Sequence, residues 1–151
     1  MTVFKESKMP SIRTLIASLA LIAPLAQAAT PVTLYKSPTC GCCEEYVKYL
    51  QANGFVVKAI NSDDMNRVKH DNHVGNLGSC HTALIDGYVV EGHVPVAAIQ
   101  KMLKQRPKIV GISAPGMPAN SPGMGEMKPG SLKIYEIAAK ESVNPKVFSI
   151  E

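Results

Sequence analysis

The sequence predicts a single α/β domain that follows a removable leader, and three observations support this prediction. Strand-like and helix-like patterns alternate between residues 32 and 105. The segment 111–130 holds five glycines and four prolines, too many for a long regular element. Once the leader is removed, 123 residues remain, which is enough to bury one hydrophobic core. We therefore expect residues 29–151 to form one domain.

Residues 1–28 have the order of parts of a secretory signal peptide. Three basic residues precede an apolar run over 14–26, and Ala26 and Ala28 supply small residues at the positions that signal peptidase recognises. The run is shorter than the roughly 20 residues of a membrane-spanning helix. We therefore expect cleavage after Ala28, export to the periplasm of a double-membrane bacterium, and no membrane association after cleavage.

Strand and helix signals then follow one another along the exported part. Residues 32–36 are β-branched and aromatic in character, which predicts a strand. Thr39 is a candidate N-cap for a helix that runs to Gln51, and Asn53-Gly54 is a typical helix stop. The later patterns predict strands at 55–60, 81–85, 88–91, 132–137 and 147–150 and helices at 65–71 and 96–105, with Asp86-Gly87 as a hairpin turn.

This order, a strand–helix–strand unit followed by a hairpin and a helix, is the order of the thioredoxin-like fold. We expect the first two strands to be parallel and their crossover right-handed. The segment 40–43 would then lie where the first strand passes into the first helix, and the loop that carries Cys80 would face the same helix end. The predicted fold is therefore a thioredoxin-like single domain with a Pro/Gly/Met-rich C-terminal loop extension.

All four cysteines fall in the exported part, and three of them are clustered. Cys40, Cys42 and Cys43 lie within four residues, and Cys80 follows 37 positions later. Thiols without a redox or metal-binding role do not stay reduced in an oxidising compartment. Cysteines adjacent in sequence form a disulfide with each other only with strain. Two structural disulfides therefore explain the pattern poorly, and the cysteines are better interpreted as redox-active, metal-bound or both.

Cys40 and Cys43 have the CxxC spacing of a redox pair at a predicted helix N-terminus, where free N–H groups stabilise a thiolate. This pair alone fits a redox enzyme and a metal site equally well. Cys42 favours the metal site, because dithiol exchange needs no third sulfur and convergent thiolates select soft ions such as Cu(I) or Zn(II). A structural zinc site of four cysteines is a weaker alternative, because adjacent cysteines crowd a tetrahedron.

Histidine and methionine supply the remaining candidate ligands. His81 adjoins Cys80, and a role as metal ligand and a role as hydrogen-bonded structural residue are equally open. Met117 and Met124 lie in the Pro/Gly-rich segment, where no helical face needs packing, and a thioether binds Cu(I) without losing a proton. His93 is expected to pack inside the domain or to lie at its surface, and His70 and His73 are expected to lie at the surface.

The composition excludes several other classes of function. The net charge of +4, part of it in the leader, is too small to indicate binding to nucleic acid or to an anionic membrane. Tryptophan is absent and other aromatic residues are few, so platforms for stacking bases are poorly supplied. The sequence contains no HExxH motif and no glycine-rich phosphate loop.

Five separated motifs stand in order along the exported part: Lys36-Ser-Pro-Thr-Cys-Gly-Cys-Cys43, Ser79-Cys-His-Thr-Ala83, Glu91-Gly-His-Val-Pro95, Val110–Pro118 and Ser121-Pro-Gly-Met124. Together they resemble the CopG-type periplasmic copper-resistance proteins. The resemblance implies a thioredoxin-like fold and a sulfur-rich copper site. By position, it implies these metal-site residues, the last three with less defined roles: Cys40, Cys42, Cys43, Cys80, His81, Met117 and Met124.

We therefore expect an exported protein that holds Cu(I) in a cysteine-thiolate cluster for copper resistance or homeostasis. Bridging sulfurs could hold more than one ion and copper could cycle between Cu(I) and Cu(II), which leaves open whether the chain is an enzyme, a copper oxidoreductase. Expected partners are copper ions and another periplasmic copper protein or an exporter, but not nucleic acid. The alternative function is a periplasmic thiol-disulfide oxidoreductase that uses Cys40 and Cys43.

Overall fold

The computed structural model describes Thr2 and residues 29–151 of the chain. The predicted signal peptide lies outside the described residues, apart from Thr2. Among the helices of the described part, none is long and apolar enough to cross a membrane.

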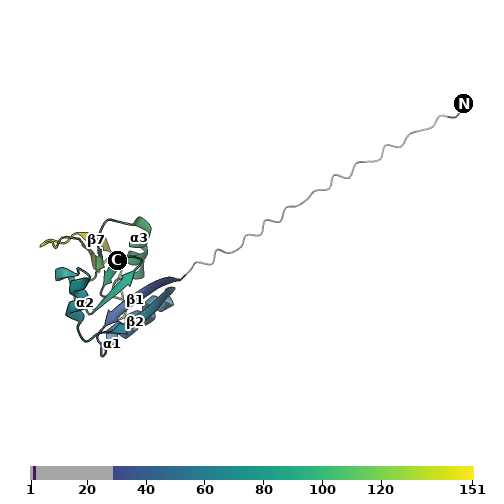
Figure 1. Ribbon diagram of the computed structural model, residues 1–151. Helices are drawn as coiled ribbons and strands as arrows, with labels where there is room; N and C mark the ends of the chain where they lie inside the picture. Colours follow the sequence, from purple (N-terminus) through teal and green to yellow (C-terminus); the bar gives the residue numbers. More distant parts are fainter. Residues whose placement is uncertain (1, 3–28) are drawn as a thin grey trace.

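In the described part, one mixed sheet of seven strands forms the centre of the domain (Figure 1). Its order is β2-β1-β3-β4-β5-β6-β7. β1 and β2 are parallel, β3 is antiparallel to both of its neighbours, and β5 is parallel to β4. The strands are β1 (Thr30–Lys36), β2 (Phe55–Asn61), β3 (His81–Ile85), β4 (Tyr88–Glu91), β5 (Gly111–Ser113), β6 (Lys133–Ile137) and β7 (Val147–Ile150).

The helices follow the strands in the predicted order. α1 (Gly41–Ala52) connects β1 to β2, α2 (Met65–Asp71) and a short 3₁₀ turn, η1 (Gly75–Leu77), precede β3, and α3 (Val96–Gln105) follows the β3–β4 hairpin. The predicted α/β single domain is confirmed, and its first four strands and three helices have the order expected of a thioredoxin-like core.

The N-cap of α1 is Cys40 and not Thr39, which the sequence suggested. Cys40 N donates a hydrogen bond to Ser37 O at 3.2 Å, so Thr39 is held inside a tight turn. The extended backbone of Cys40 follows this turn, and Glu44 N then donates to Cys40 O at 3.3 Å. The helix therefore begins inside the cysteine motif.

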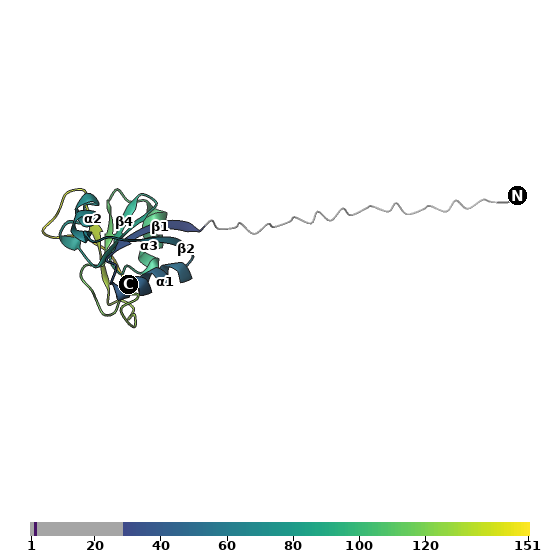
Figure 2. The same cartoon turned by 60° about the horizontal axis from the view of Figure 1, so that its bottom comes forward.

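The main core lies between one face of the sheet and the two helices α1 and α3 (Figure 2). Apolar residues alternate along β1, where Val32 and Leu34 are buried, as expected of a strand with one face on the core. β4 contributes to both faces, because Val90 packs in the main core and Val89 in a smaller cluster. This smaller cluster also contains Val74, Leu77 and Ile137.

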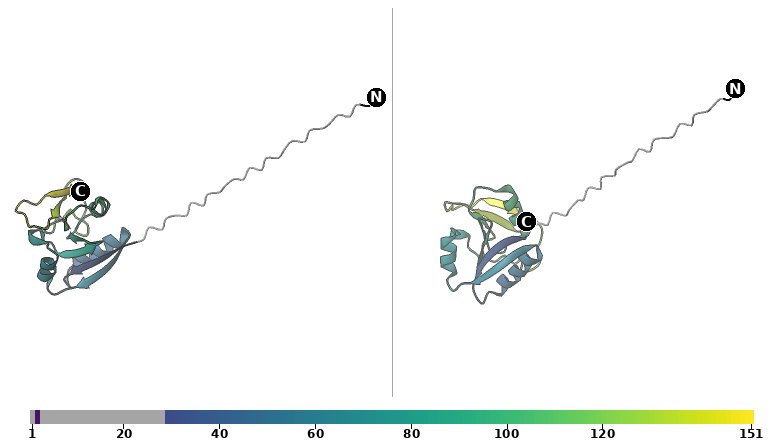
Figure 3. Two further views of the ribbon diagram at one scale, coloured as in Figure 1. Left: turned by 45° about the horizontal axis from the view of Figure 1, so that its top comes forward. Right: turned by 45° about the vertical axis from the view of Figure 1, so that its right-hand side comes forward.

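The last three strands extend the same sheet beyond β4. Figure 3 shows β6 and β7 at the edge opposite β2. β5, which the sequence did not predict, has only three residues. It pairs so closely with β4 that a Cβ atom at Gly111 would collide with the Val89 carbonyl, so glycine is required there. The C-terminal extension is therefore anchored by strands at both ends of its loop.

Candidate metal centre

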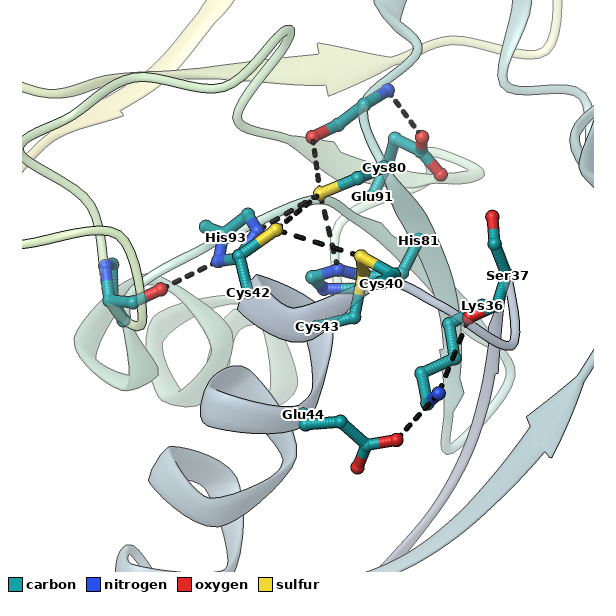
Figure 4. Close-up of a disulfide and its surroundings, with 12 residues drawn as sticks. Lys36, Ser37, Cys40, Cys42, Cys43, Glu44, Cys80, His81, Glu91 and His93 are labelled. Atoms are coloured by element: carbon teal, nitrogen blue, oxygen red, sulfur yellow. Dashed lines mark hydrogen bonds and ion pairs between the residues drawn. A yellow bond between two sulfur atoms is a disulfide. The ribbon is translucent and has the colours of Figure 1, made fainter.

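The pairing of β1 with β3 brings the two cysteine-bearing segments together. In this antiparallel ladder Lys36, the last residue of β1, is opposite His81, the first residue of β3. The segment that leaves β1 and the residue that enters β3 must therefore lie side by side. As a result, the Sγ atoms of all four cysteines lie within 4.8 Å of one another (Figure 4).

The four cysteines are in two different states. Cys40 and Cys43 form a disulfide, while Cys42 and Cys80 are free thiols. Cys42 Sγ lies 3.6 Å from Cys40 Sγ and 3.9 Å from Cys80 Sγ. The structure thus shows a one-disulfide state in which the two thiols adjoin the disulfide.

His93 makes the shortest contact with a free thiol. Its Nε2 atom lies 3.0 Å from Cys80 Sγ, and its Nδ1 atom lies 2.6 Å from the Pro122 carbonyl oxygen. Because a carbonyl can only accept, Nδ1 carries the proton, and Nε2 therefore presents a lone pair to Cys80. A neutral imidazole held in this way by a backbone carbonyl is typical of a metal ligand.

His81 also lies beside Cys80. Its Nδ1 atom is 3.7 Å from Cys80 Sγ, and its ring packs on Tyr46 and His93 at centroid distances of 4.5 and 4.8 Å. Burial, followed by the neighbouring His93, holds the pKa of His81 well below its ordinary value. Its buried Nε2 atom has no hydrogen-bond partner among the described residues. The ring is therefore neutral, which is the form that binds metal ions.

Cys80 is protonated at neutral pH in the metal-free state. Burial, and to a smaller extent the neighbouring Cys42, raises the pKa of the Cys80 thiol to about 11. Since the thiolate is the form that binds a metal ion, binding at Cys80 must release a proton.

A buried carboxylate fixes the turn that carries Cys80. Glu91 accepts hydrogen bonds from Ser79 N at 2.6 Å, from Thr82 Oγ1 at 2.6 Å and from Lys69 Nζ at 2.5 Å. Glu91 is fully buried, and Lys69 neutralises its charge. Residues on both sides of Cys80 are thereby tied to Glu91 of β4, two residues before His93.

A second buried charge supports the other cysteine segment. Lys36 is buried, and its Nζ atom lies 2.6 Å from Glu44 Oε1 and donates to Ser37 O at 3.3 Å. This ion pair connects the end of β1 to the first turn of α1 (Figure 4). It therefore braces the segment that contains Cys40, Cys42 and Cys43.

The Pro/Gly/Met-rich loop lies against both cysteine segments. Gly123 packs on the first turn of α1, where a Cβ atom would lie 2.9 Å from Tyr46 N and 3.2 Å from Cys42 O. Gly116 forms a bridge with Ser79, whose Oγ also donates to the Gly116 carbonyl. The next residue after each of these glycines is a predicted ligand: the exposed Met117 and the half-buried Met124.

Two solved structures are similar to this chain, both of a copper resistance protein copG, in its form 2 and its form 1. Both are 37% identical to it, cover 81% and 80% of this chain and 98% and 96% of their own length, and give TM-scores of 0.72 and 0.71. This chain belongs to the CopG copper-resistance family. A family model described as "Protein of unknown function, DUF411" matches residues 77–124, and none of the curated proteins matches.

Within this CopG-family chain, the structure brings together five of the seven predicted site residues, namely the four cysteines and His81. Met117 is 63% exposed, so its side chain faces solvent. His70 and His73 are exposed, as expected. Sequence reasoning assigned no role to His93, although the motif Glu91-Gly-His-Val-Pro95, on which the resemblance partly rests, contains it.

Proposed function

We propose that the protein is an exported copper-binding protein that holds Cu(I) in a thiolate cluster of Cys40, Cys42, Cys43 and Cys80, for copper resistance or homeostasis. One observation carries this proposal: the four Sγ atoms lie within 4.8 Å of one another. Convergent soft sulfur ligands favour Cu(I) over hard ions. Membership of a family of copper resistance proteins supports copper as the metal.

Cys80 supports a cluster of more than one ion. It belongs to the four-sulfur group and also to a second group with His81 and His93, whose ligand atoms lie within 4.8 Å of one another. A single thiolate that adjoins two ligand groups can bridge two ions. The second group adds imidazole nitrogen, which suits copper in both oxidation states, so it also supports cycling between Cu(I) and Cu(II).

All four sulfurs become available only when the Cys40–Cys43 disulfide is reduced by two electrons. In the one-disulfide state, Cys42 and Cys80 remain as thiol ligands beside the two buried histidines. The redox state of Cys40 and Cys43 would therefore change the number of sulfur ligands. Met124 and the exposed Met117 are proposed as outer ligands from the adjoining loop.

The first experiment is an anaerobic Cu(I) titration of the reduced chain 29–151 against a competing chelator. Wild-type protein is expected to remove Cu(I) from the chelator, and Cys42→Ser to bind at least about tenfold more weakly. His70→Ser is the control, because the side chain of His70 is 89% exposed. Binding no tighter than that of a simple dithiol, and unchanged in Cys42→Ser, would contradict the proposal.

A thiol-disulfide oxidoreductase is the second candidate, and the Cys40–Cys43 disulfide at the N-terminus of α1 favours it. The two functions differ in what they require. Turnover of a disulfide substrate that needs no copper and survives Cys42→Ser would support the oxidoreductase, and dependence on copper or on Cys42 would support the copper protein.

A further inference from the structure

The four sulfur atoms form a continuous chain across the site. Cys43 is bonded to Cys40, Cys42 Sγ lies 3.6 Å from Cys40 Sγ, and Cys80 Sγ lies 3.9 Å from Cys42 Sγ. One disulfide and two thiols therefore form a compact cluster, in which Cys42 Sγ contacts both Cys40 Sγ and Cys80 Sγ (Figure 4). Thiol–disulfide exchange requires this arrangement, in which a thiolate directly adjoins a disulfide sulfur.

We propose that the disulfide migrates along this chain of sulfurs, so that the Cys40–Cys43 isomer interconverts with a Cys42–Cys80 isomer inside one molecule. The inference deepens the proposed function, because it concerns the same four cysteines. It assigns to them a covalent reaction that needs no metal ion.

In the first step, the thiolate of Cys42 attacks Cys40 Sγ. The Cys42–Cys40 bond forms and the Cys40–Cys43 bond breaks, leaving Cys43 as a thiolate that takes up the proton lost by Cys42. The two sulfurs start 3.6 Å apart and must approach to about 2.05 Å. Only Gly41 separates the two cysteines. Apart from its chain neighbours and the backbone of α1, no described atom lies within 4 Å of an ideal Cβ there, so the backbone has room to adjust.

In the second step, the thiolate of Cys80 attacks Cys42 Sγ. The Cys80–Cys42 bond forms and the Cys42–Cys40 bond breaks, leaving Cys40 as a thiolate that takes up the proton lost by Cys80. One disulfide and two thiols are present before and after both steps, so no external oxidant or reductant is consumed. The starting separation is 3.9 Å, about 1.9 Å beyond bonding distance.

The two isomers differ in what they can do. The Cys40–Cys43 isomer leaves the thiol of Cys80 beside His93, at 3.0 Å from its Nε2 atom. In the Cys42–Cys80 isomer, both of these cysteines are in the disulfide and offer no thiol. The free thiols are then those of the CxxC pair, Cys40 and Cys43, at the N-terminus of α1. The two isomers would therefore offer a metal ion different ligands, a thiol beside two histidines in one and the CxxC dithiol in the other.

Tryptic digestion distinguishes the isomers. Cleavage after lysine and arginine places Cys40, Cys42 and Cys43 in the peptide 37–48 and Cys80 in the peptide 70–101. A Cys40–Cys43 disulfide lies within the first peptide, whereas a Cys42–Cys80 disulfide joins the two. The metal-free one-disulfide chain 29–151 is incubated anaerobically with a chelator, quenched with acid, alkylated and digested.

We expect the joined peptides to accumulate with a first-order rate that does not depend on protein concentration, with alkyl groups on Cys40 and Cys43. The migration would be overturned if no joined peptides form and Cys42 and Cys80 remain the alkylated cysteines. It would also be overturned if the rate at which the joined peptides form is proportional to protein concentration.

Cys42→Ser tests the order of the steps. Without the Cys42 sulfur, the two peptides should stay unjoined. Joined peptides in this variant would show that Cys80 attacks the Cys40–Cys43 disulfide directly and would overturn the relay. These outcomes are separate from the proposed function. If the reduced chain binds Cu(I) tightly but the one-disulfide form never yields joined peptides, the migration is refuted and the proposed function is not.

Discussion

At the scale of single residues, one hydrogen bond decides which nitrogen of His93 faces Cys80. The Pro122 carbonyl accepts a hydrogen bond from Nδ1–H, and the lone pair of Nε2 is therefore available to the thiol or to a metal ion. No motif of the sequence contains this information, because Pro122 belongs to the C-terminal loop and His93 follows β4. The cysteines could be predicted from their spacing, whereas the role of His93 depends on a contact between segments 29 residues apart.

Replacement of His93 tests this orientation. We expect His93→Gln to weaken Cu(I) binding by about tenfold to a hundredfold, since an amide is a poorer copper ligand than an oriented imidazole. Competition with a Cu(I) chelator measures the change. His70→Gln is the matched control and should leave the affinity unaltered; an equal loss in both variants would indicate a nonspecific effect.

Because His81 is buried, we expect the stability of the folded domain to depend on pH. Its pKa in the folded metal-free state is well below the ordinary value of 6.5, so the unfolded chain binds a proton at a higher pH than the folded one. Stability from this group is present above pH 6.5 and is lost as the pH falls toward its folded-state pKa, by about 1.4 kcal/mol per pH unit.

Denaturant unfolding of wild type and His81→Leu at a series of pH values between 7.5 and about 4.5 measures this loss. The variant should lose less stability over that range, because leucine does not titrate. His73→Leu, at an exposed position, is the control, and its unfolding free energy should fall with pH as steeply as that of wild type. Parallel slopes in wild type and His81→Leu would show that His81 is not the group responsible.

At the scale of elements, the Glu91 carboxylate connects α2, β3 and β4 through Lys69, Thr82 and Ser79. Glu91→Gln removes the charge that neutralises Lys69 and is expected to destabilise the fold by about 3 kcal/mol, because a largely buried ion pair loses one partner. It should also weaken Cu(I) binding, because Ser79 positions Cys80.

Glu45→Gln is the matched control for this prediction. It breaks an ion pair with Lys48 whose two side chains are 57% and 70% exposed, and should cost less than about 1 kcal/mol. Urea unfolding of both variants provides the comparison. If Glu91→Gln and Glu45→Gln lower the free energy of unfolding by a similar small amount, the Glu91 network does not stabilise the domain.

The loop that covers α1 gives a second test at this scale. Gly123 has φ +78° and touches the helix backbone, whereas Gly130 has φ +74° and open space around it. Gly130→Ala should cost about 1 kcal/mol from backbone strain alone, and Gly123→Ala clearly more, because its methyl group meets Tyr46 N. Unfolding free energies measure both, and equal losses would show that the loop does not pack on α1.

Most regular elements could be predicted from local patterns, and the bounds of α2, β3, β4 and α3 agree with the predictions. These segments carry clear capping, alternation or turn signals. β5 has three residues inside a Pro/Gly-rich segment, too few for any periodicity, and its pairing with β4 depends on the close approach at Gly111. The cap of α1 was misplaced by one residue, because the turn from Ser37 to Cys40 is stabilised by backbone hydrogen bonding.

At the scale of the whole molecule, residues 29–151 contain a complete hydrophobic core. We expect the chain expressed in a double-membrane bacterium to be recovered from the periplasm with Ala29 as its first residue, which N-terminal sequencing and cell fractionation measure. Replacement of the basic residues Lys5 and Lys8 by glutamate should retain the chain in the cytoplasm. A periplasmic product that still begins at Met1 would contradict cleavage.

The pairing of Lys36 with His81 has a consequence for substitutions far from any sulfur atom. Side chains alternate along a strand, so a slip of one residue would turn His81 to the opposite face of the sheet. A slip of two residues would displace Cys80 by about 7 Å along the strand. A substitution in either strand that shifts this alignment would therefore weaken the proposed Cu(I) site without changing any ligand. Such loss-of-function positions would fall along β1 and β3 rather than around the ligands.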